Sequence, residues 1–296
     1  MTGVLLVDKP EGTTSAGVIR TLKPRLGRTK VGHLGTLDPF ASGLLPLCLG
    51  EATKVARYLL VEEKDYEGTI SLGTATDTLD RTGSPIATAP VPPLAQPELD
   101  AVAARFTGRQ QQVPPMYSAL KRDGVPLYEL ARRGLEVERA PREITIERIE
   151  LALSGPDRID FRIACSKGTY VRVLAADVGR ALGTVAHLER LRRTRVGAFR
   201  VEDATAVDAL LGLAPGATLP VVAVRDALAG YAAFSAPSDA LGRLRRGQQE
   251  PLARLPAPRA AGETALLLDP AGNVAAVIEA AGARAAWRLV RLLGVS

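Results

Sequence analysis

The chain has 296 residues, of which 46% are hydrophobic, and a net charge of +6 at pH 7 with a pI near 9.5. No segment reaches the roughly 18 consecutive apolar residues that a membrane-spanning helix needs. The two cysteines lack a short paired spacing and there are two histidines, which excludes a Cys/His zinc site and a His-rich cluster. We therefore expect a cytoplasmic protein without a metal site, long enough for two domains.

Positive charge is concentrated in the middle of the chain. Residues 105–200 carry 19 basic and 11 acidic side chains, whereas the segments before and after them are close to neutral. A bias toward arginine explains why arginine outnumbers lysine, but it does not explain the uneven distribution. Concentrated positive charge predicts a partner with a phosphate backbone.

The first predicted strand covers residues 4–7 and ends at the turn Lys9-Pro10-Glu11-Gly12. Because this start has no basic region and its apolar run stops at Asp8, we expect a strand and not a signal peptide. A helix should follow, with Ser15 as its N-cap.

The loop Gly32-His33-Leu34-Gly35-Thr36-Leu37-Asp38-Pro39 comes next. Proline after Asp38 favours extended geometry for the aspartate, and the glycines allow tight turns and close approach of a ligand. The apolar run of residues 44–49 supplies a buried anchor. An isolated Asp-Pro is most often a turn, so the loop alone does not assign a function.

Residues 65–72 alternate between apolar and polar side chains, which is the period of a half-buried strand with Tyr66 pointing inward. On periodicity alone, a core tyrosine is the simpler interpretation. Five prolines within residues 84–97 predict a surface connection. Pro97 then opens a helix that ends before Gly108.

Residues 110–141 contain prolines, glutamines and paired arginines without clear periodicity. Long irregular segments in compact domains are usually functional or disordered. We predict one helix near residues 127–133, and the positive charge favours contact with a phosphate backbone.

Another alternating segment, residues 159–165, predicts a strand that leads through Lys167-Gly168 into a helix. Arg172 lies off the apolar stripe of that helix and in its first turn, where the helix dipole disfavours a cation by roughly 0.3 to 1 kcal/mol. An anionic partner would remove this conflict. An exposed arginine without a partner is the alternative.

The composition changes after residue 201, where alanines become frequent. Residues 219–220 and 235–238 are predicted joints, and residue 241 opens a new unit. The apolar runs 265–268 and 274–278 flank a turn and predict a hairpin.

Several motifs occur in order between Gly3 and about Phe199. They are Lys9-Pro10, residues 32–38, Asp65-Tyr66, residues 114–121, Lys167-Gly168-Thr169-Tyr170-Val171-Arg172 and Leu191-Arg192-Arg193-Thr194. Together they resemble the motifs of the bacterial-type tRNA pseudouridine-55 synthases, the TruB family. Leu34 departs from the pattern, which by this resemblance expects Thr or Ser, so the departure concerns a local hydroxyl contact and not the nucleophile.

The resemblance implies an α+β fold. Residues 1–230 would form the catalytic domain of the pseudouridine synthase fold, with a mixed, largely antiparallel sheet. Together with the positive charge, the resemblance favours an RNA-gripping insertion at residues 110–141 over a disordered loop. Residues 231–296 would form a small PUA-like β-barrel that binds RNA.

The resemblance also implies a function, the conversion of the T-loop uridine at position 55 of tRNA to pseudouridine. The base would be flipped out of its stack, and Asp38 would act as the nucleophile. Attack at C1′ of the sugar, attack at C6 of the base and stabilisation of a glycal intermediate all remain open. The reaction retains every atom, so no cofactor or metal is expected.

Roles for the other site residues follow from the same resemblance. Arg172 would keep Asp38 ionised, and Tyr66 would stack on the uracil and could take the C5 proton. Tyr170 and Leu191 would line the base pocket. His33 would hold the nucleotide out of its stack, and Lys9 would support the Asp38 loop.

We expect the T-arm of tRNA as the partner, with no membrane, no obligatory protein partner and a monomeric enzyme. Two alternatives are open. One is a guide-dependent synthase that modifies ribosomal RNA, whose members we expect to carry extra terminal segments. The other is a tRNA-binding chaperone without catalysis, which Asp38→Asn would distinguish because binding alone does not need the carboxylate.

Overall fold

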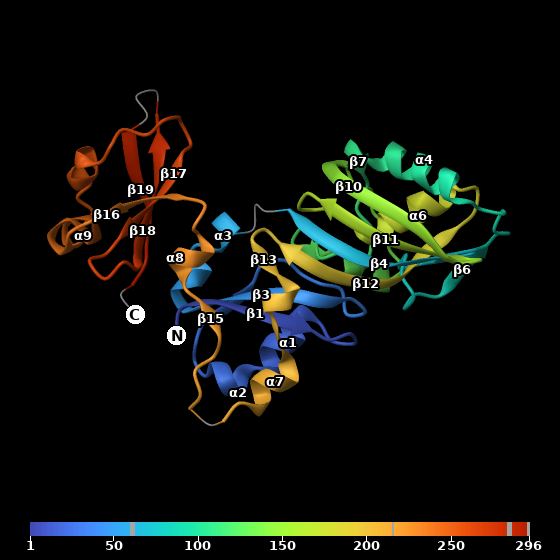
Figure 1. Cartoon of the computed structure of the whole chain (residues 1–296), viewed down its shortest axis with the longest axis horizontal. Coiled ribbons are helices and arrows are strands. Elements are labelled where there is room, and N and C mark those ends of the chain that lie inside the picture. Colours follow the sequence, from blue (N-terminus) through green and yellow to red (C-terminus); the bar gives the residue numbers. More distant parts are fainter. Residues whose placement is uncertain (60–62, 215, 283–285, 295–296) are drawn as a thin grey trace.

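The computed structural model describes residues 1–59, 63–214, 216–282 and 286–294. Within these residues, an eleven-stranded mixed sheet forms the larger part of the molecule and a separate four-stranded sheet follows it toward the C-terminus (Figure 1). Helices pack around the large sheet, and two short ribbons of paired strands lie outside it. The α+β fold predicted from the sequence is confirmed.

The strands of the large sheet come from most of the chain. They are β1 (Gly3–Lys9), β2 (Val31–His33), β3 (Ser42–Leu49), β4 (Lys64–Leu72), β7 (Gly108–Gln112), β10 (Arg142–Gly155), β11 (Arg158–Cys165), β12 (Ala186–Val196), β13 (Phe199–Arg200), β14 (Thr205–Ala206) and β15 (Val221–Val222). Their order is β14-β1-β3-β12-β4-β11-β10-β7, with β2 on β3, β13 on β12 and β15 on β1. The pairs β1–β14 and β3–β12 are parallel, and the central pairs β12–β4, β4–β11 and β11–β10 are antiparallel.

The ribbons are β5–β6 and β8–β9, made of β5 (Thr74–Thr76), β6 (Pro85–Thr88), β8 (Lys121–Arg122) and β9 (Val125–Pro126). The helices are α1 (Ser15–Thr21), α2 (Lys23–Leu26), α3 (Ala56–Leu59), α4 (Gln96–Phe106), α5 (Leu127–Arg132), α6 (Val171–Ala181), α7 (Val207–Gly212), α8 (Val224–Ala227) and α9 (Ser238–Arg245). In the part of the chain that the structure describes, none of them combines the length and hydropathy needed to cross a bilayer.

Helices α4 and α6 pack on the half of the large sheet that contains β4, β10, β11 and β12 (Figure 1). The apolar stripe of α6 consists of Val171, Leu174 and Val178, each at most 4% exposed. These side chains share a core with Ile70 and Phe161 of the sheet. Complete burial of one such side chain stabilises the fold by about 1.5 to 3 kcal/mol, so this stripe fixes the start of α6 on the sheet.

The C-terminal sheet has the strand order β16-β17-β18-β19, with β16 (Ala232–Ser235), β17 (Thr264–Leu268), β18 (Val274–Ala281) and β19 (Ala286–Leu292). Its Leu266 and Val277 lie in one hydrophobic cluster with Val4 of β1 and with Ala52. Glu279 accepts hydrogen bonds from Tyr58 Oη at 2.8 Å and Arg57 Nη2 at 2.7 Å. This sheet is therefore packed onto the large part, and its assignment as a PUA-like barrel stays a prediction.

Several predicted elements are confirmed. The strand at residues 65–72 is β4, the strand at residues 159–165 is β11, and the C-terminal hairpin is β17–β18. The helix expected after Pro97 is α4, and the helix expected in the insertion is α5.

Other predictions were wrong in detail. The N-cap of α1 is Thr14, whose hydroxyl accepts from Gly17 N, and Ser15 is the first helical residue. The proline-rich connection contains β6, which begins at Pro85, a position where a strand tolerates proline. Residues 110–112 belong to β7 of the large sheet, so the irregular part of the insertion starts at residue 113.

Candidate active site

Asp38 lies in the loop between β2 and β3, and the apolar side chains around it in this loop are buried. Leu34, Leu37 and Phe40 are each at most 3% exposed, whereas the Asp38 side chain keeps 34% of its surface exposed. The apolar side chains on both sides therefore anchor the loop in the core and leave the carboxylate at the surface of the site.

Leu34 anchors the Asp38 loop in the core. Its side chain is fully buried and packs with Leu44, Cys48 and Val55. Here the loop is fixed by packing.

Replacing Leu34 by a residue with a hydroxyl group should therefore destabilise this chain. Leu34→Thr removes buried carbon and introduces a hydroxyl, and we expect a loss of about 2 to 4 kcal/mol of unfolding free energy. Leu34→Met, which conserves volume, should lose less than about 1.5 kcal/mol. Urea and thermal unfolding of both variants measure the difference, and equal stability of Leu34→Thr and wild type would contradict the packing argument.

Polar contacts from the N-terminal segment hold the backbone around Asp38. Ser15 Oγ accepts from Leu37 N at 2.9 Å and lies 3.2 Å from Leu37 O. Lys9 is fully buried, and its Nζ donates to the carbonyl oxygens of Pro10 at 2.9 Å, Thr13 at 2.8 Å and Pro39 at 3.3 Å. Burial lowers the pKa of Lys9 to about 8, while the charge of Asp38 opposes this shift.

Arg193 of β12 holds the same loop as well. The residue is 1% exposed, and its guanidinium donates to Leu44 O at 2.8 Å, Gly35 O at 3.1 Å and Thr36 O at 3.5 Å. This approach depends on Gly43, which pairs with Arg193 at a φ of +101°. A Cβ on Gly43 would lie 2.3 Å from the Arg193 carbonyl oxygen, which is too close for any other residue.

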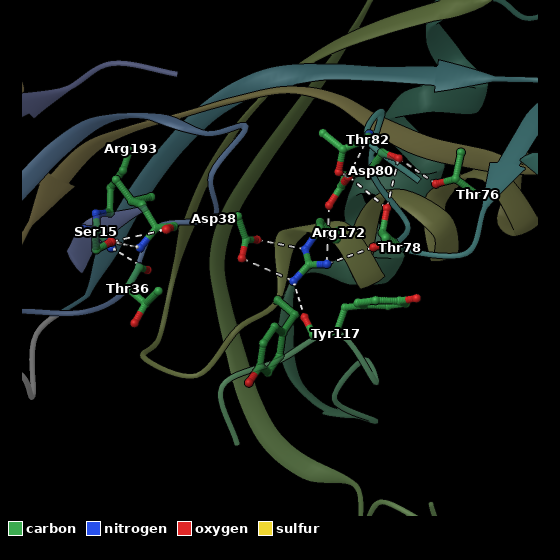
Figure 2. A network of polar contacts seen from close by, with 12 residues as sticks. Ser15, Thr36, Asp38, Thr76, Thr78, Asp80, Thr82, Tyr117, Arg172 and Arg193 are labelled. Carbon is green, nitrogen blue, oxygen red and sulfur yellow. Dashed lines mark hydrogen bonds and ion pairs between the residues drawn. The ribbon is translucent and has the colours of Figure 1, made fainter. Parts of the chain in front are cut away.

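Arg172 is the second partner of the Asp38 loop. Its Nε lies 2.9 Å from Asp38 Oδ2 and its Nη1 lies 3.4 Å from Asp80 Oδ2. The same guanidinium donates to Thr78 O at 2.9 Å and Tyr117 O at 2.8 Å. The pair with Asp38 that we expected from the sequence is therefore present, but Arg172 is buried and not on an exposed helix face. Figure 2 places Asp38 between Arg172 on one side and the Arg193 contacts on the other.

Asp80 is a site residue that sequence reasoning missed. It lies in the loop between β5 and β6, with 5% of its side chain exposed. Its Oδ1 accepts from Thr78 Oγ1 at 2.9 Å, Thr82 N at 2.9 Å and Thr82 Oγ1 at 2.5 Å (Figure 2). The signal was present in the spacing, because threonines two residues before and after an aspartate can cap its carboxylate locally.

The ionisation of Asp38 reflects these neighbours. Burial raises the pKa of the carboxyl above its ordinary value, Arg172 lowers it through charge and hydrogen bonding, and Asp80 raises it. A carboxylate next to a buried guanidinium is favoured in its charged form. The net effect raises the pKa of Asp38, and the Arg172 guanidinium is the neighbour that most favours the anion at this partly exposed position.

Two aromatic side chains lie near this anion. Tyr66 of β4 is 9% exposed, and burial raises its pKa to about 12. Tyr170 precedes α6, and Gln112 holds its backbone by donating to Tyr170 O at 3.2 Å and accepting from Tyr170 N at 2.8 Å. Burial also raises the pKa of Tyr170, and the charge of Asp38 contributes to the rise for both tyrosines.

Leu191 and His33 are the two remaining residues that the sequence predicted for the site. Leu191 of β12 is buried in the same cluster as Tyr66. His33 ends β2, and burial together with the charge of Arg193 lowers its pKa, which favours a neutral ring. Its Nδ1 is buried and has no hydrogen-bond partner among the described residues. Within the described part of the chain, no three His, Cys, Asp or Glu side chains gather as a metal site.

Comparisons with known proteins show which family the chain resembles. Residues 23–171 match the TruB family pseudouridylate synthase N-terminal domain, and residues 172–214 match the tRNA pseudouridylate synthase B C-terminal domain. The tRNA pseudouridine synthase B of Aromatoleum aromaticum is 53% identical over 77% of this chain and 74% of its own length. Proteins of the same name from Opitutus terrae and Bordetella pertussis are 50% and 47% identical, over 71% and 77% of this chain and 88% and 94% of their own lengths.

Solved structures show the same fold. A crystal structure of a Cbf5-Nop10-Gar1 complex contains a chain with a TM-score of 0.73 and 25% identity, which covers 98% of this chain and 84% of that one. An H/ACA RNP bound to a substrate RNA contains another, with a TM-score of 0.71 and 23% identity over 99% of this chain and 86% of that one.

Proposed function

The chain belongs to the TruB family of pseudouridylate synthases, and from this premise we propose that it converts the T-loop uridine at position 55 of tRNA to pseudouridine. The single observation that supports this most is the Asp38 carboxylate, held by buried anchors and paired at 2.9 Å with the buried Arg172 guanidinium. The relatives that match at 47% to 53% identity are named for tRNA, which favours a stand-alone tRNA enzyme over a guide-dependent one.

The reaction breaks the bond between N1 of uracil and C1′, turns the base and joins C5 to C1′. The base has to leave its stack to reach Asp38, and a T-loop uridine is already in an irregular structure, which lowers the cost of flipping. Asp38 then acts at C1′ or at C6, or stabilises a glycal intermediate, and the rigid loop fixes its position for each of these routes.

The neighbouring side chains take the roles that their positions allow. Arg172 keeps Asp38 ionised by a charge-assisted hydrogen bond. Tyr66 stacks on the flipped uracil and accepts the C5 proton, and Tyr170 and Leu191 line the pocket. His33, with a neutral ring, holds the nucleotide out of its stack.

Support comes from Lys9, whose amine is buried among carbonyl oxygens and has no exposed surface. We propose that it stabilises the Asp38 loop without contacting RNA.

The enzyme acts as a monomer in the cytoplasm on the T-arm of tRNA, without cofactor or metal and without an obligatory protein partner. The C-terminal sheet contributes to RNA binding as a PUA-like domain.

Tritium release tests the function directly. A tRNA transcript labelled at C5 of its uridines should release tritium on incubation with the protein, because C5 loses its hydrogen when it bonds to C1′. A transcript with cytidine in place of the T-loop target uridine is the control and should release none. Equal release from both transcripts would contradict the choice of site, and no release from either would contradict the isomerase.

The insertion should carry part of the RNA affinity. Arg122, Arg132 and Arg133 are exposed on or near α5 and β8, and we expect each to neutralise a phosphate. Reversing all three to glutamate should weaken tRNA binding and reduce the slope of log K against log salt by roughly two to three. Filter binding across a salt series measures this slope.

A matched triple reversal tests whether the position of the charges matters. Arg105, Arg148 and Arg158 are also exposed but lie outside the insertion. Their reversal changes the net charge equally and should leave most of the salt slope in place. Equal loss of slope in both triple variants would mean that the insertion has no special share in binding.

A further inference from the structure

Gln112 is a buried polar side chain at the point where the large sheet passes into the irregular part of the insertion. It is 6% exposed and ends β7, where it pairs with Arg142 of β10. Both ends of its amide bond to one residue of another element. Nε2 donates to Tyr170 O at 3.2 Å, and Oε1 accepts from Tyr170 N at 2.8 Å. Burying an amide is costly without such bonds, and an apolar side chain would serve packing alone.

The two hydrogen bonds hold the backbone of Tyr170 on both sides of its Cα atom. Tyr170 immediately precedes α6, and its backbone is extended, with a φ of −98° and a ψ of 102°. Its carbonyl oxygen also accepts the first hydrogen bonds of the helix, from Val173 N at 3.1 Å and Leu174 N at 3.2 Å. Because the amide of Gln112 holds the two peptide groups that flank this Cα atom, it restrains both dihedral angles. These angles determine the direction in which the Tyr170 ring leaves the chain.

The chain returns to the start of α6 a few residues after Gln112. The carbonyl oxygen of Tyr117 accepts from Arg172 Nη2 at 2.8 Å (Figure 2). Two buried prolines, at residues 114 and 115, lie between the two contacts and stiffen the segment, because their rings fix φ. We call residues 112–117 the strap. It binds the start of α6 at both ends, once before the helix and once at the arginine that pairs with Asp38.

We propose that Gln112 is a positioning residue that sets the direction of the Tyr170 ring in the site. The inference rests on the proposed function, in which Tyr170 lines the pocket of the flipped uracil. Gln112 acts through the backbone of Tyr170 and not by contact with the base. A ring turned away from the pocket leaves the uracil free to move relative to Asp38. Misplacement of reacting groups by about 1 Å lowers a rate by about 10²-fold.

The test compares the same substitution at two positions of one strand. Gln112→Met removes both hydrogen bonds and keeps nearly the same side-chain length. Gln110→Met is the matched control, because Gln110 lies two residues earlier on β7 and its Nε2 donates at 2.7 Å to the carbonyl oxygen of Phe106 in α4. The control therefore loses an amide-to-carbonyl hydrogen bond that does not involve α6.

Single-turnover kinetics with the full chain and a T-arm transcript should separate rate from binding. We expect Gln112→Met to form pseudouridine about 10- to 100-fold more slowly. Its affinity for the transcript should change less than about twofold, because that affinity comes mainly from phosphate contacts. Gln110→Met should keep both values near those of wild type. An equal loss of rate in the two variants, or a wild-type rate in Gln112→Met, overturns the proposal.

Fluorine NMR measures the position of the ring without reference to activity. With 3-fluorotyrosine at position 170 alone, the resonance should shift or broaden in Gln112→Met and stay unchanged in Gln110→Met. An unchanged resonance in a folded Gln112→Met variant overturns the proposal. Wild type that forms no pseudouridine would instead be a failure of the proposed function, and the fluorine spectrum would still test the position of the ring.

A purely structural role of Gln112 predicts other results. A loosened end of β7 would lower the rate equally whether or not the Tyr170 ring is present. We expect instead that Gln112→Met has little additional effect on the rate in the Tyr170→Ala background, because no ring is left to position. A full additional loss there overturns the proposal.

Thermal unfolding shows whether Gln112→Met folds. If it does not fold, Gln112→Asn takes its place, because the shorter amide cannot reach both backbone groups of Tyr170. This variant should then show the lowered rate and the shifted fluorine resonance. Wild-type values for both overturn the proposal.

Discussion

Asp38→Asn is expected to abolish pseudouridine formation, with a rate lower by on the order of 10⁵-fold, the scale seen when a covalent nucleophile is removed. Asparagine has the same size and keeps the packing of Leu37 and Phe40 around it. It loses the charge that pairs with Arg172 Nε at 2.9 Å and the oxygen that would act on the nucleotide. Tritium release under single-turnover conditions measures the rate.

Binding provides the control for this variant. The amide removes a negative charge from the site, so tRNA affinity should be unchanged or slightly higher, and the salt slope should stay the same. Asp38→Glu, which keeps the charge but moves the carboxylate by one methylene, separates charge from position and should be strongly impaired. Substantial pseudouridine formation by Asp38→Asn would remove Asp38 from the mechanism.

Arg172→Gln is expected to have the second largest effect. Removing one partner of a buried ion pair lowers the free energy of unfolding by about 3 to 5 kcal/mol. Because Arg172 also fixes the position of Asp38, we expect the rate at neutral pH to fall by roughly 10²-fold. Arg172 lowers the pKa of Asp38, so its removal raises that pKa further above the ordinary value. Because activity requires ionised Asp38, the acidic limb of the pH–rate profile should move to higher pH.

Asp80→Asn gives the opposite shift and is the matched control. Asp80 raises the pKa of Asp38, so its neutralisation lowers that pKa and moves the acidic limb to lower pH. Its rate at neutral pH should also fall, because Arg172 loses the partner that lies 3.4 Å from Nη1. Profiles of kcat/KM from acidic to neutral pH for the two variants measure both shifts. A shift in the same direction for both would contradict the assignment of the acidic limb to Asp38.

The sequence predicted those parts of the molecule that are governed by local patterns. Alternation identified β4 and placed Tyr66 inside, and helical spacing identified the stripe of α6. The dipole conflict at Arg172 indicated an anionic partner, and the structure places Asp38 there. The strand and the helix were predictable because their apolar patterns repeat every few residues. The partner of Arg172 was predictable because a cation at the start of a helix is unfavourable by itself.

The parts that could not be predicted depend on long-range packing. Arg193 is one arginine among many, and only the parallel pairing of β3 with β12 brings it to the carbonyl oxygens of the Asp38 loop. Asp80 requires the β5–β6 ribbon to fold back toward α6 before its charge meets Arg172. The periodicity of a sequence does not determine the order of strands in a sheet. An arginine that becomes buried by strand pairing therefore has the same local sequence pattern as an exposed one.

The contact between Arg193 and Leu44 also has a consequence for synthesis of the protein on the ribosome. The two residues are 149 positions apart, and at about 5 to 20 residues per second the second emerges roughly 7 to 30 s after the first. During that time the Asp38 loop lacks the hydrogen bonds that Arg193 donates to Gly35 and Thr36. A nascent or prematurely terminated chain therefore has the aspartate without the site, and RNA that meets it during translation cannot be modified.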